Sequence, residues 1–221
     1  MGLILIWMRF RDRWDAGGRL LTALESKVGG ESTVLAIPRG GVVIGYVIAE
    51  GLGAPLDLVM VRKIGVPGNP ELAAGAVAEG GEVYVEEEVL ELYGLDAEYV
   101  TARARSELET LRRRASELRG GLRPLPIEGK EVVLTDDGIA TGSTVIAACR
   151  CVRSRSPRRL VVAVPVASAE AASRVSREAD ELVALYVSED FLAVGEFYED
   201  FSQVDDNTVR ELLTRSRSIR A

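Results

Sequence analysis

The chain has 221 residues, which is enough for one well-buried domain with a small appendage. Hydrophobic residues make up 47% and charged residues 28% of it, as in ordinary soluble globular proteins, and the net charge of −7 argues against nucleic acid or an anionic membrane as a partner. The sequence contains no histidine, which excludes Ser-His and Cys-His catalytic arrangements and every histidine-ligated metal site.

The N-terminus and the two cysteines are typical of a cytoplasmic protein. Residues 1–8 are apolar, but this stretch is too short to span a bilayer and has no basic leader, so we expect an edge strand or an ordered arm. Cys149 and Cys151 lie two apart on a predicted helix, where their side chains point in different directions and cannot pair. We therefore expect two reduced, buried or half-buried thiols.

A first anion-binding corner is predicted at residues 34–52. After an amphipathic helix over residues 12–28, residues 34–37 form a short apolar run of the kind seen in central parallel strands. Pro38-Arg39-Gly40-Gly41 follows, and a helix is predicted over residues 42–52. A helix N-terminus behind a glycine turn attracts anions, and Arg39 could donate two hydrogen bonds to a phosphate. The alternative is a tight turn with a solvated arginine.

A basic pair and a hairpin come next. Residues 58–61 predict a second strand, and Arg62 and Lys63 stand at its carboxyl end, where open α/β sheets bind ligands. The alternative is an exposed basic pair at the start of a surface loop. Residues 73–85 predict a β-hairpin whose two alternating runs flank Glu79-Gly80-Gly81.

Residues 98–119 predict a long helix, which we assign to a dimer interface. Its apolar positions alternate in spacings of four and three, at Ala104, Leu108, Leu111, Ala115 and Leu118. Arginines and glutamates, Arg119 among them, cover the other faces as salt-bridged flanks. In a second interpretation these arginines reach a neighbouring site or RNA.

The strongest pattern is at residues 132–144. An apolar run as long as a buried strand ends at Asp136 and Asp137, and a loop of small residues then leads into a helix. Hydroxyl donors in this loop come from Thr141, Ser143 and Thr144. The lysine of a P-loop is missing, so this is not that nucleotide site. Instead, the carboxylates could accept hydrogen bonds from sugar hydroxyls or hold Mg²⁺ through water. The alternative is an acidic turn before a capped helix.

The remaining elements complete an α/β pattern. Strands are predicted over residues 160–166 and 182–187 with a helix over 169–179 between them, so the implied sheet has five parallel strands with right-handed crossovers. Residues 188–206 hold three of the four phenylalanines, and residues 209–216 predict a terminal helix. We divide the chain into a core over residues 1–187 and a C-terminal part over residues 188–221.

Residues 132–144 closely resemble the phosphoribosyl-pyrophosphate (PRPP) signature of type I phosphoribosyltransferases. The resemblance implies that fold, with a lid insertion over residues 64–122 and a hood followed by a C-terminal helix over residues 188–221. It also implies that Asp136 and Asp137 bind the ribose 2′- and 3′-hydroxyls, act in catalysis and hold Mg²⁺. The other residues that it implies in PRPP binding are Gly138, Ile139, Ala140, Thr141, Gly142, Ser143 and Thr144.

The segments before the signature carry the same resemblance. In these enzymes a loop at the place of Arg39, Gly40 and Gly41 grips the pyrophosphate. The pattern Arg62-Lys63-x-Gly-x-Pro-Gly looks like the segment of adenine phosphoribosyltransferases whose basic pair approaches the PRPP phosphates. Arg62 and Lys63 are therefore implied in PRPP binding, and Arg39 and Lys63 in stabilising charge on the leaving pyrophosphate.

The lid and the hood resemble purine enzymes. The hairpin corresponds to a mobile lid that excludes water from the reaction, and Glu79 would be the carboxylate that handles the proton of the acceptor. Phe191-Leu192-Ala193-Val194-Gly195 is similar to the run that stacks the base in hypoxanthine and guanine enzymes, which implies that Phe191 and Val194 bind the acceptor. The aromatic side chains could equally well seal the core of the hood.

The leading hypothesis is a PRPP- and Mg²⁺-dependent phosphoribosyltransferase of purine salvage, a homodimer that uses a purine base and contacts no membrane. The sequence is also similar to a group of stand-alone predicted phosphoribosyltransferases that share the Pro-Arg-Gly-Gly, Gly-Asn-Pro-Glu-Leu and Phe-x-Ala-Val-Gly segments. The main alternative is a PRPP- or nucleotide-sensing regulator that binds RNA or a partner without turnover. A PRPP synthase would need an ATP-binding half, and a purely structural α/β protein would bind no ligand.

Overall fold

The computed structural model describes residues 9–29 and 31–218. The expected strand or arm at residues 1–8 lies outside this part of the chain. Among the described residues, no helix has both the length and the apolar character needed to cross a membrane.

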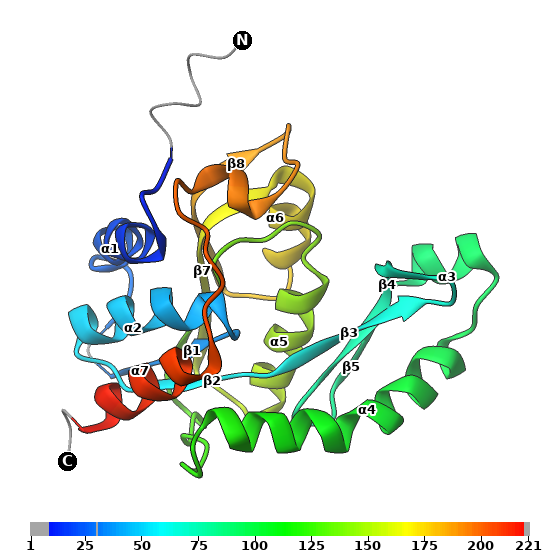
Figure 1. Ribbon diagram of the computed structural model, residues 1–221, viewed down its shortest axis with the longest axis horizontal. Helices are drawn as coiled ribbons and strands as arrows, with labels where there is room; N and C mark the ends of the chain where they lie inside the picture. Colours follow the sequence, from blue (N-terminus) through cyan, green and yellow to red (C-terminus); the bar gives the residue numbers. More distant parts are fainter. Residues whose placement is uncertain (1–8, 30, 219–221) are drawn as a thin grey trace.

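A five-stranded parallel sheet forms the centre of the protein, with the strand order β2-β1-β6-β7-β8 (Figure 1). The strands are β1 (Ser32–Ala36), β2 (Leu56–Leu58), β6 (Glu131–Thr135), β7 (Arg159–Ser168) and β8 (Glu181–Ser188). The α/β class and the five parallel strands are thus confirmed. The predicted strand over residues 58–61 is wrong in its bounds, because β2 ends at Leu58 and the chain then leaves the sheet.

Helices cover both faces of this sheet (Figure 1). On one face lie α1 (Arg13–Leu24), α2 (Gly40–Leu52) and α7 (Asp206–Ser218), which share one core cluster. On the other lie α5 (Ser143–Ser154) and α6 (Ala169–Val175). Asp12 begins α1 because its side chain accepts the N–H of Asp15. The predicted helices are present, with ends that differ by a few residues.

A flap projects from the core between β2 and β6 (Figure 1). It contains an antiparallel sheet of β3 (Val61–Val66), β4 (Asn69–Ala78) and β5 (Val83–Val85), followed by α3 (Glu87–Tyr93) and α4 (Ala97–Leu118). The predicted hairpin is β4 and β5, but β3 pairs along the other edge of β4. The turn of that hairpin lies at the base of the flap, where Arg112 of α4 donates to the carbonyls of Glu79 and Gly80.

The apolar stripe of α4 packs inside the chain. Ala104 and Leu111 are buried against the flap sheet, and Ala115 and Leu118 join the core cluster of the central domain, where α4 contacts α7. The assignment of this stripe to a dimer interface is therefore wrong, because its apolar surface is already covered within one chain.

The C-terminal part crosses back over the core. A 3-10 turn over Val194–Phe197 follows β8, and the chain then runs across the sheet to α7 (Figure 1). Phe10 is fully buried among this segment, with its ring 5.4 Å from that of Tyr198. The C-terminal helix α7 packs with α2, and the division of the chain at residue 187 stays a prediction.

Candidate active site

The two predicted anion-binding corners are neighbours at the carboxyl edge of the sheet. β1 and β6 pair in register up to Ala36 and Thr135, and the N–H of Ile37 donates to the carbonyl of Thr135 at 2.9 Å. A Cβ atom on Gly40 would lie 1.9 Å from Oδ2 of Asp137. Only glycine fits at this point, so the turn after β1 touches the carboxylate pair after β6. The peptide bond between Pro38 and Arg39 is cis.

The loop between Asp137 and α5 is held in place by β7. The N–H of Ile139 donates to Val166 O, and the N–H of Ser168 donates to Ile139 O, each at 2.9 Å. The hydroxyl of Ser168 also donates to Ala140 O at 2.7 Å. Gly142 then has a φ of 86° and begins α5. The first amides of a helix lack acceptors within it, so this fixed loop presents N–H groups to an anion.

A cavity of about 190 Å³ lies over this loop, and we call it the phosphate-loop cavity. Its lining includes Lys63 from the flap and Asp136 from the carboxylate pair, so the cavity joins the basic and the acidic parts of the predicted site. Val194 closes it from the hood side and would meet any side chain placed on Gly138, whose Cβ would lie 2.6 Å from Cγ1 of Val194. The remaining lining residues are Gly138, Ile139, Ala140, Thr141, Gly142, Thr144 and Val145.

Arg13 is part of the site, although it is not among the predicted site residues. Its Nε and Nη2 atoms both lie 2.8 Å from Oδ2 of Asp137, and both side chains are largely buried. Burial raises the pKa of Asp137, and the guanidinium of Arg13 opposes this rise. Burial and the adjacent charge of Asp137 raise the pKa of Asp136 well above its usual range. The guanidinium of Arg13 therefore favours the charged form of Asp137, whereas burial and the neighbouring charge disfavour the charged form of Asp136.

Arg13 also connects the carboxylates to the C-terminal segment. Its Nη1 donates to the carbonyl of Ser202 at 2.8 Å, and its guanidinium lies 3.9 Å from the ring centre of Phe201. The hydroxyl of Tyr198 donates to the carbonyl of Asp137 at 2.7 Å. Burial, and next the charge of Asp137, raise the pKa of this phenol, which keeps it protonated as a donor. Residues 198–202 and the carboxylate pair thus form one hydrogen-bonded unit.

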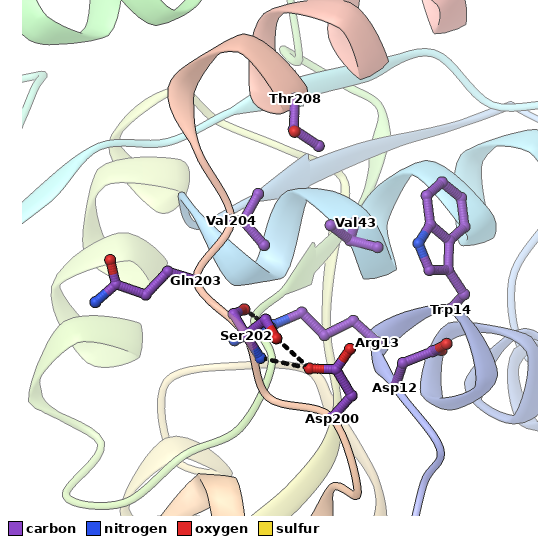
Figure 2. Close-up of a pocket in the computed structure, with 9 residues that line it drawn as sticks. All are labelled: Asp12, Arg13, Trp14, Val43, Asp200, Ser202, Gln203, Val204 and Thr208. Atoms are coloured by element: carbon purple, nitrogen blue, oxygen red, sulfur yellow. Dashed lines mark hydrogen bonds between the residues drawn. The ribbon is translucent and has the colours of Figure 1, made fainter.

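A second cavity, of about 320 Å³, is lined by Arg13 (Figure 2). We call it the Trp14 cavity. Figure 2 shows Trp14 and Gln203 at its two ends, with Asp200 accepting from the N–H and the hydroxyl of Ser202 below. Trp14 is half-exposed and packs edge-on against Tyr46. The arginine that pairs with Asp137 therefore lines the Trp14 cavity, whereas Asp136 lines the phosphate-loop cavity.

Three of the predicted ligand residues point elsewhere. Arg39 stands beside Gly40, but its Nη1 lies 3.8 Å from Asp206 and its side chain is half-exposed. Arg62 pairs with Glu107 at 3.0 Å on the outer side of the flap. Phe191 stacks on Phe197 with a centroid distance of 5.3 Å, and it lines neither cavity.

Glu79 lies outside the phosphate-loop cavity and is held by Arg119. Two nitrogens of Arg119 donate to its two carboxylate oxygens, each at 2.7 Å. Arg119 also pairs with the fully buried Asp57 at 2.9 Å, so it is an internal residue and not a salt-bridged flank. The interpretation of Glu79 as a proton-handling group is not supported by this placement, because its charge is already neutralised at the base of the flap.

A separate link joins the flap to α6 beside the phosphate loop. Tyr84 donates to Glu86 at 2.7 Å, and Arg174 of α6 contacts both. Burial and the hydrogen bond to Glu86 raise the pKa of Tyr84 to about 12. A cavity of about 240 Å³ at this link is also lined by Ala140, Thr141 and Ser143, so the flap borders the loop from a second side.

The donor set fits Mg²⁺ shared with a ligand and does not fit a self-contained metal site. Among the described residues, no group of three or more histidine, cysteine or carboxylate side chains is arranged to hold a metal. Mg²⁺ is commonly bound by one or two carboxylates together with substrate phosphates. Asp136 lines the phosphate-loop cavity, whereas one oxygen of Asp137 is already bound by Arg13. Asp136 is therefore the better of the two predicted ligands.

Comparison with known proteins agrees with this geometry. The family model of the phosphoribosyl transferase domain matches residues 14–201. Two Mycobacterium tuberculosis proteins, from strains CDC 1551 / Oshkosh and H37Rv, carry the name "Putative phosphoribosyl transferase" and are each 41% identical over 207 residues. These residues are 94% of this chain but 47% of each relative, so the chain spans about half the length of the curated relatives it matches.

Two solved structures show the same fold. The crystal structure of TT1426 from Thermus thermophilus is 46% identical and has a TM-score of 0.80, with 94% of this chain and 99% of that chain covered. A hypothetical protein from Neisseria gonorrhoeae is 14% identical, with a TM-score of 0.51 and 95% of each chain covered. The second similarity concerns the fold alone.

Proposed function

Because this chain belongs to the phosphoribosyl transferase domain family, we propose that it moves the 5-phosphoribosyl group of PRPP to a nitrogen acceptor and releases pyrophosphate. The observation that carries the proposal is the contact between the two corners. Gly40 lies against Asp137, so an anion at the turn after β1 and an anion at the N-terminus of α5 would be held at one continuous edge. PRPP carries phosphate groups at both ends of one sugar and suits such an edge.

In this proposal the phosphate loop binds the 5′-phosphate, and Asp136 and Asp137 accept hydrogen bonds from the ribose hydroxyls. Gly40 and Gly41 let the pyrophosphate approach the backbone, and Lys63 faces it from the flap. Arg13 opposes the rise in the pKa of Asp137 that burial causes, and it orients this carboxylate. Mg²⁺, when bound, would neutralise phosphate charge beside Asp136. Catalysis then consists mainly of positioning and charge neutralisation around a breaking C1–O bond.

We propose a purine base as the acceptor, in a homodimeric cytoplasmic enzyme. Val194 closes the phosphate-loop cavity on the hood side, where an acceptor would meet the sugar. Phe191 is less suited to the stacking role that we expected, since one face of its ring is covered by Phe197. The two cysteines are buried, unpaired thiols, as expected in a reducing compartment.

The test is a pyrophosphate-release assay with PRPP, Mg²⁺ and a panel of purine, pyrimidine and pyridine bases. We expect release that depends on one base and is lost in Asp136→Asn. Release with no dependence on any base, or equal release from Asp136→Asn, would contradict the proposal. PRPP binding without base-dependent release would favour the alternative, a PRPP-sensing regulator.

A further inference from the structure

The amino-terminal edge of the central sheet holds a cavity of about 420 Å³, at the opposite end of the strands from the carboxylate pair. We call it the amino-edge cavity. Its lining residues stand at or directly before the first residues of four adjacent strands, β2, β1, β6 and β7, and they are Glu31, Ser32, Thr33, Pro55, Gly129, Lys130 and Arg158. None of them belongs to the proposed active site.

Two cations in this cavity have no carboxylate partner. Among the residues that the structure describes, no carboxylate oxygen lies within 4.0 Å of the side-chain nitrogens of Lys130 or Arg158. By contrast, the next residue, Arg159, is paired with both Glu131 and Glu181. The N–H of Arg158 donates to the carbonyl of Lys130 at 2.8 Å, so the backbones of these two basic residues lie side by side. Two unneutralised charges face a cavity with one carboxylate, that of Glu31.

Two hydroxyls at the same place are also unsatisfied. Ser32 is 3% and Thr33 is 1% exposed, and neither hydroxyl has a hydrogen-bond partner among the described residues. A buried polar group without a partner costs about 1–3 kcal/mol. Neighbouring side chains of a strand point to opposite faces, so we expect one of the two hydroxyls to contact a ligand in the amino-edge cavity. A ligand with several acceptor oxygens would satisfy it.

We infer that the amino-edge cavity binds a phosphate-bearing anion. Two cations and a hydroxyl donor match the oxygens of a phosphate dianion. The cavity is larger than a phosphate ion requires, so the rest of a small organic phosphate can be accommodated, with Glu31 available to accept from a hydroxyl. The site is carried by β1 and β6, whose other ends hold the two corners of the proposed active site. It does not depend on the proposed function.

Equilibrium dialysis of the full chain with radiolabelled inorganic phosphate, and separately with adenosine 5′-monophosphate, tests this site. We expect Lys130→Ala/Arg158→Ala to bind one anion fewer per chain than the wild type. Arg105→Ala/Arg177→Ala is the matched control, because it removes the same charge from two exposed arginines elsewhere and should bind as the wild type does. An equal number of bound anions in the first variant and the wild type, or an equal loss in the control, would overturn the inference.

Two further measurements test the hydroxyl contact and the independence of this cavity from the proposed active site. Ser32→Ala or Thr33→Val should weaken this binding by about tenfold, equivalent to about 1.4 kcal/mol, without lowering the melting temperature measured in the absence of anion. If both variants bind as the wild type does, the hydroxyl contact is wrong. Gly40→Ala alters the proposed active site. In a protein that carries it, Lys130→Ala/Arg158→Ala should still remove one bound anion per chain. Failure of the proposed function would remove base-dependent pyrophosphate release but not this difference.

Discussion

Replacing Arg13 by methionine tests how the carboxylate pair is held. The change keeps most of the side-chain volume and removes the cation whose Nε and Nη2 lie 2.8 Å from Asp137. Side chains of the pair are 10% and 17% exposed, so the carboxylate would lose its partner in a largely buried place. Removing one partner of a buried ion pair typically costs about 3–5 kcal/mol. We expect the free energy of unfolding to fall by about 3 kcal/mol, and PRPP binding to weaken.

A double-mutant cycle separates the ion pair from the other contacts of Arg13. The guanidinium also donates to Ser202 and stacks on Phe201, and both contacts are lost in the single variant. Urea unfolding of the wild type, Arg13→Met, Asp137→Asn and the double variant should give a coupling free energy of about 2 kcal/mol. The double variant should be more stable than Arg13→Met because no unpaired carboxylate remains. A coupling free energy near zero would refute the reasoning.

The pH dependence gives an independent check. Burial raises the pKa of Asp137 in the folded protein, and Arg13 limits this rise. Without Arg13 the pKa of Asp137 should rise further. When a carboxyl group has a higher pKa in the folded than in the unfolded protein, the folded state loses stability as the pH increases from the unfolded-state pKa to the folded-state pKa. The stability difference between wild type and Arg13→Met should therefore be small at acidic pH, where the carboxyl group is protonated in both proteins, and grow as the pH rises above the wild-type pKa of Asp137. A constant difference would mean that the charge of Asp137 is not involved.

Further predictions concern packing and burial elsewhere. Gly40→Ala should destabilise the protein by about 1–3 kcal/mol through a clash at 1.9 Å and abolish PRPP binding. By contrast, a Cβ atom on Gly18 would meet no described residue within 4 Å, so Gly18→Ala should stabilise α1 by up to about 1 kcal/mol in the same urea titration. Arg119→Met leaves the fully buried Asp57 without its main partner and should cost about 3–5 kcal/mol; a loss under about 1 kcal/mol, as for exposed pairs, would disprove this role. Burial raises the pKa of both cysteine thiols to about 12, so neither should react with a thiol reagent at about pH 8 until urea unfolds the chain; reaction in the native state would contradict their burial.

The sheet could be predicted because its signals are local. The strands β1, β6 and β7 are apolar runs followed by a glycine-rich turn or a helix, and parallel pairing then brings the ends of β1 and β6 together. This is why residues 36–41 and 135–144 could be placed at one edge from the sequence. The bounds of β2 were wrong because residues 59–61 continue the apolar run while the chain already leaves for the flap.

The contacts that hold the site depend on pairs far apart in the sequence. Arg13 and Asp137 are 124 residues apart, and Arg119 and Glu79 are 40 apart, so no periodicity connects them. For Arg13 one local signal existed: a basic residue in the first turn of a helix opposes the helix dipole, which indicates that another interaction requires it there. Arg119 had no such signal, since the long helix before it carries arginines on several faces.

The stripe of α4 was misassigned for a similar reason. An apolar face every three or four residues shows that a helix is covered, and it does not show what covers it. Here the flap sheet covers the helix at Ala104, and the core of the central domain covers it at Leu118. Only the three-dimensional path of β3 to β5 could separate this arrangement from a dimer interface.

The central claim is that two anion-binding corners share one sugar phosphate. Calorimetric titration of PRPP into the protein with Mg²⁺, alone and after saturation with pyrophosphate or with ribose 5-phosphate, tests it most directly. If PRPP occupies both corners, each of the two fragments should weaken its apparent affinity, and both together should weaken it further. If either fragment leaves the affinity for PRPP unchanged, or PRPP produces no heat at all, the two corners do not form one site.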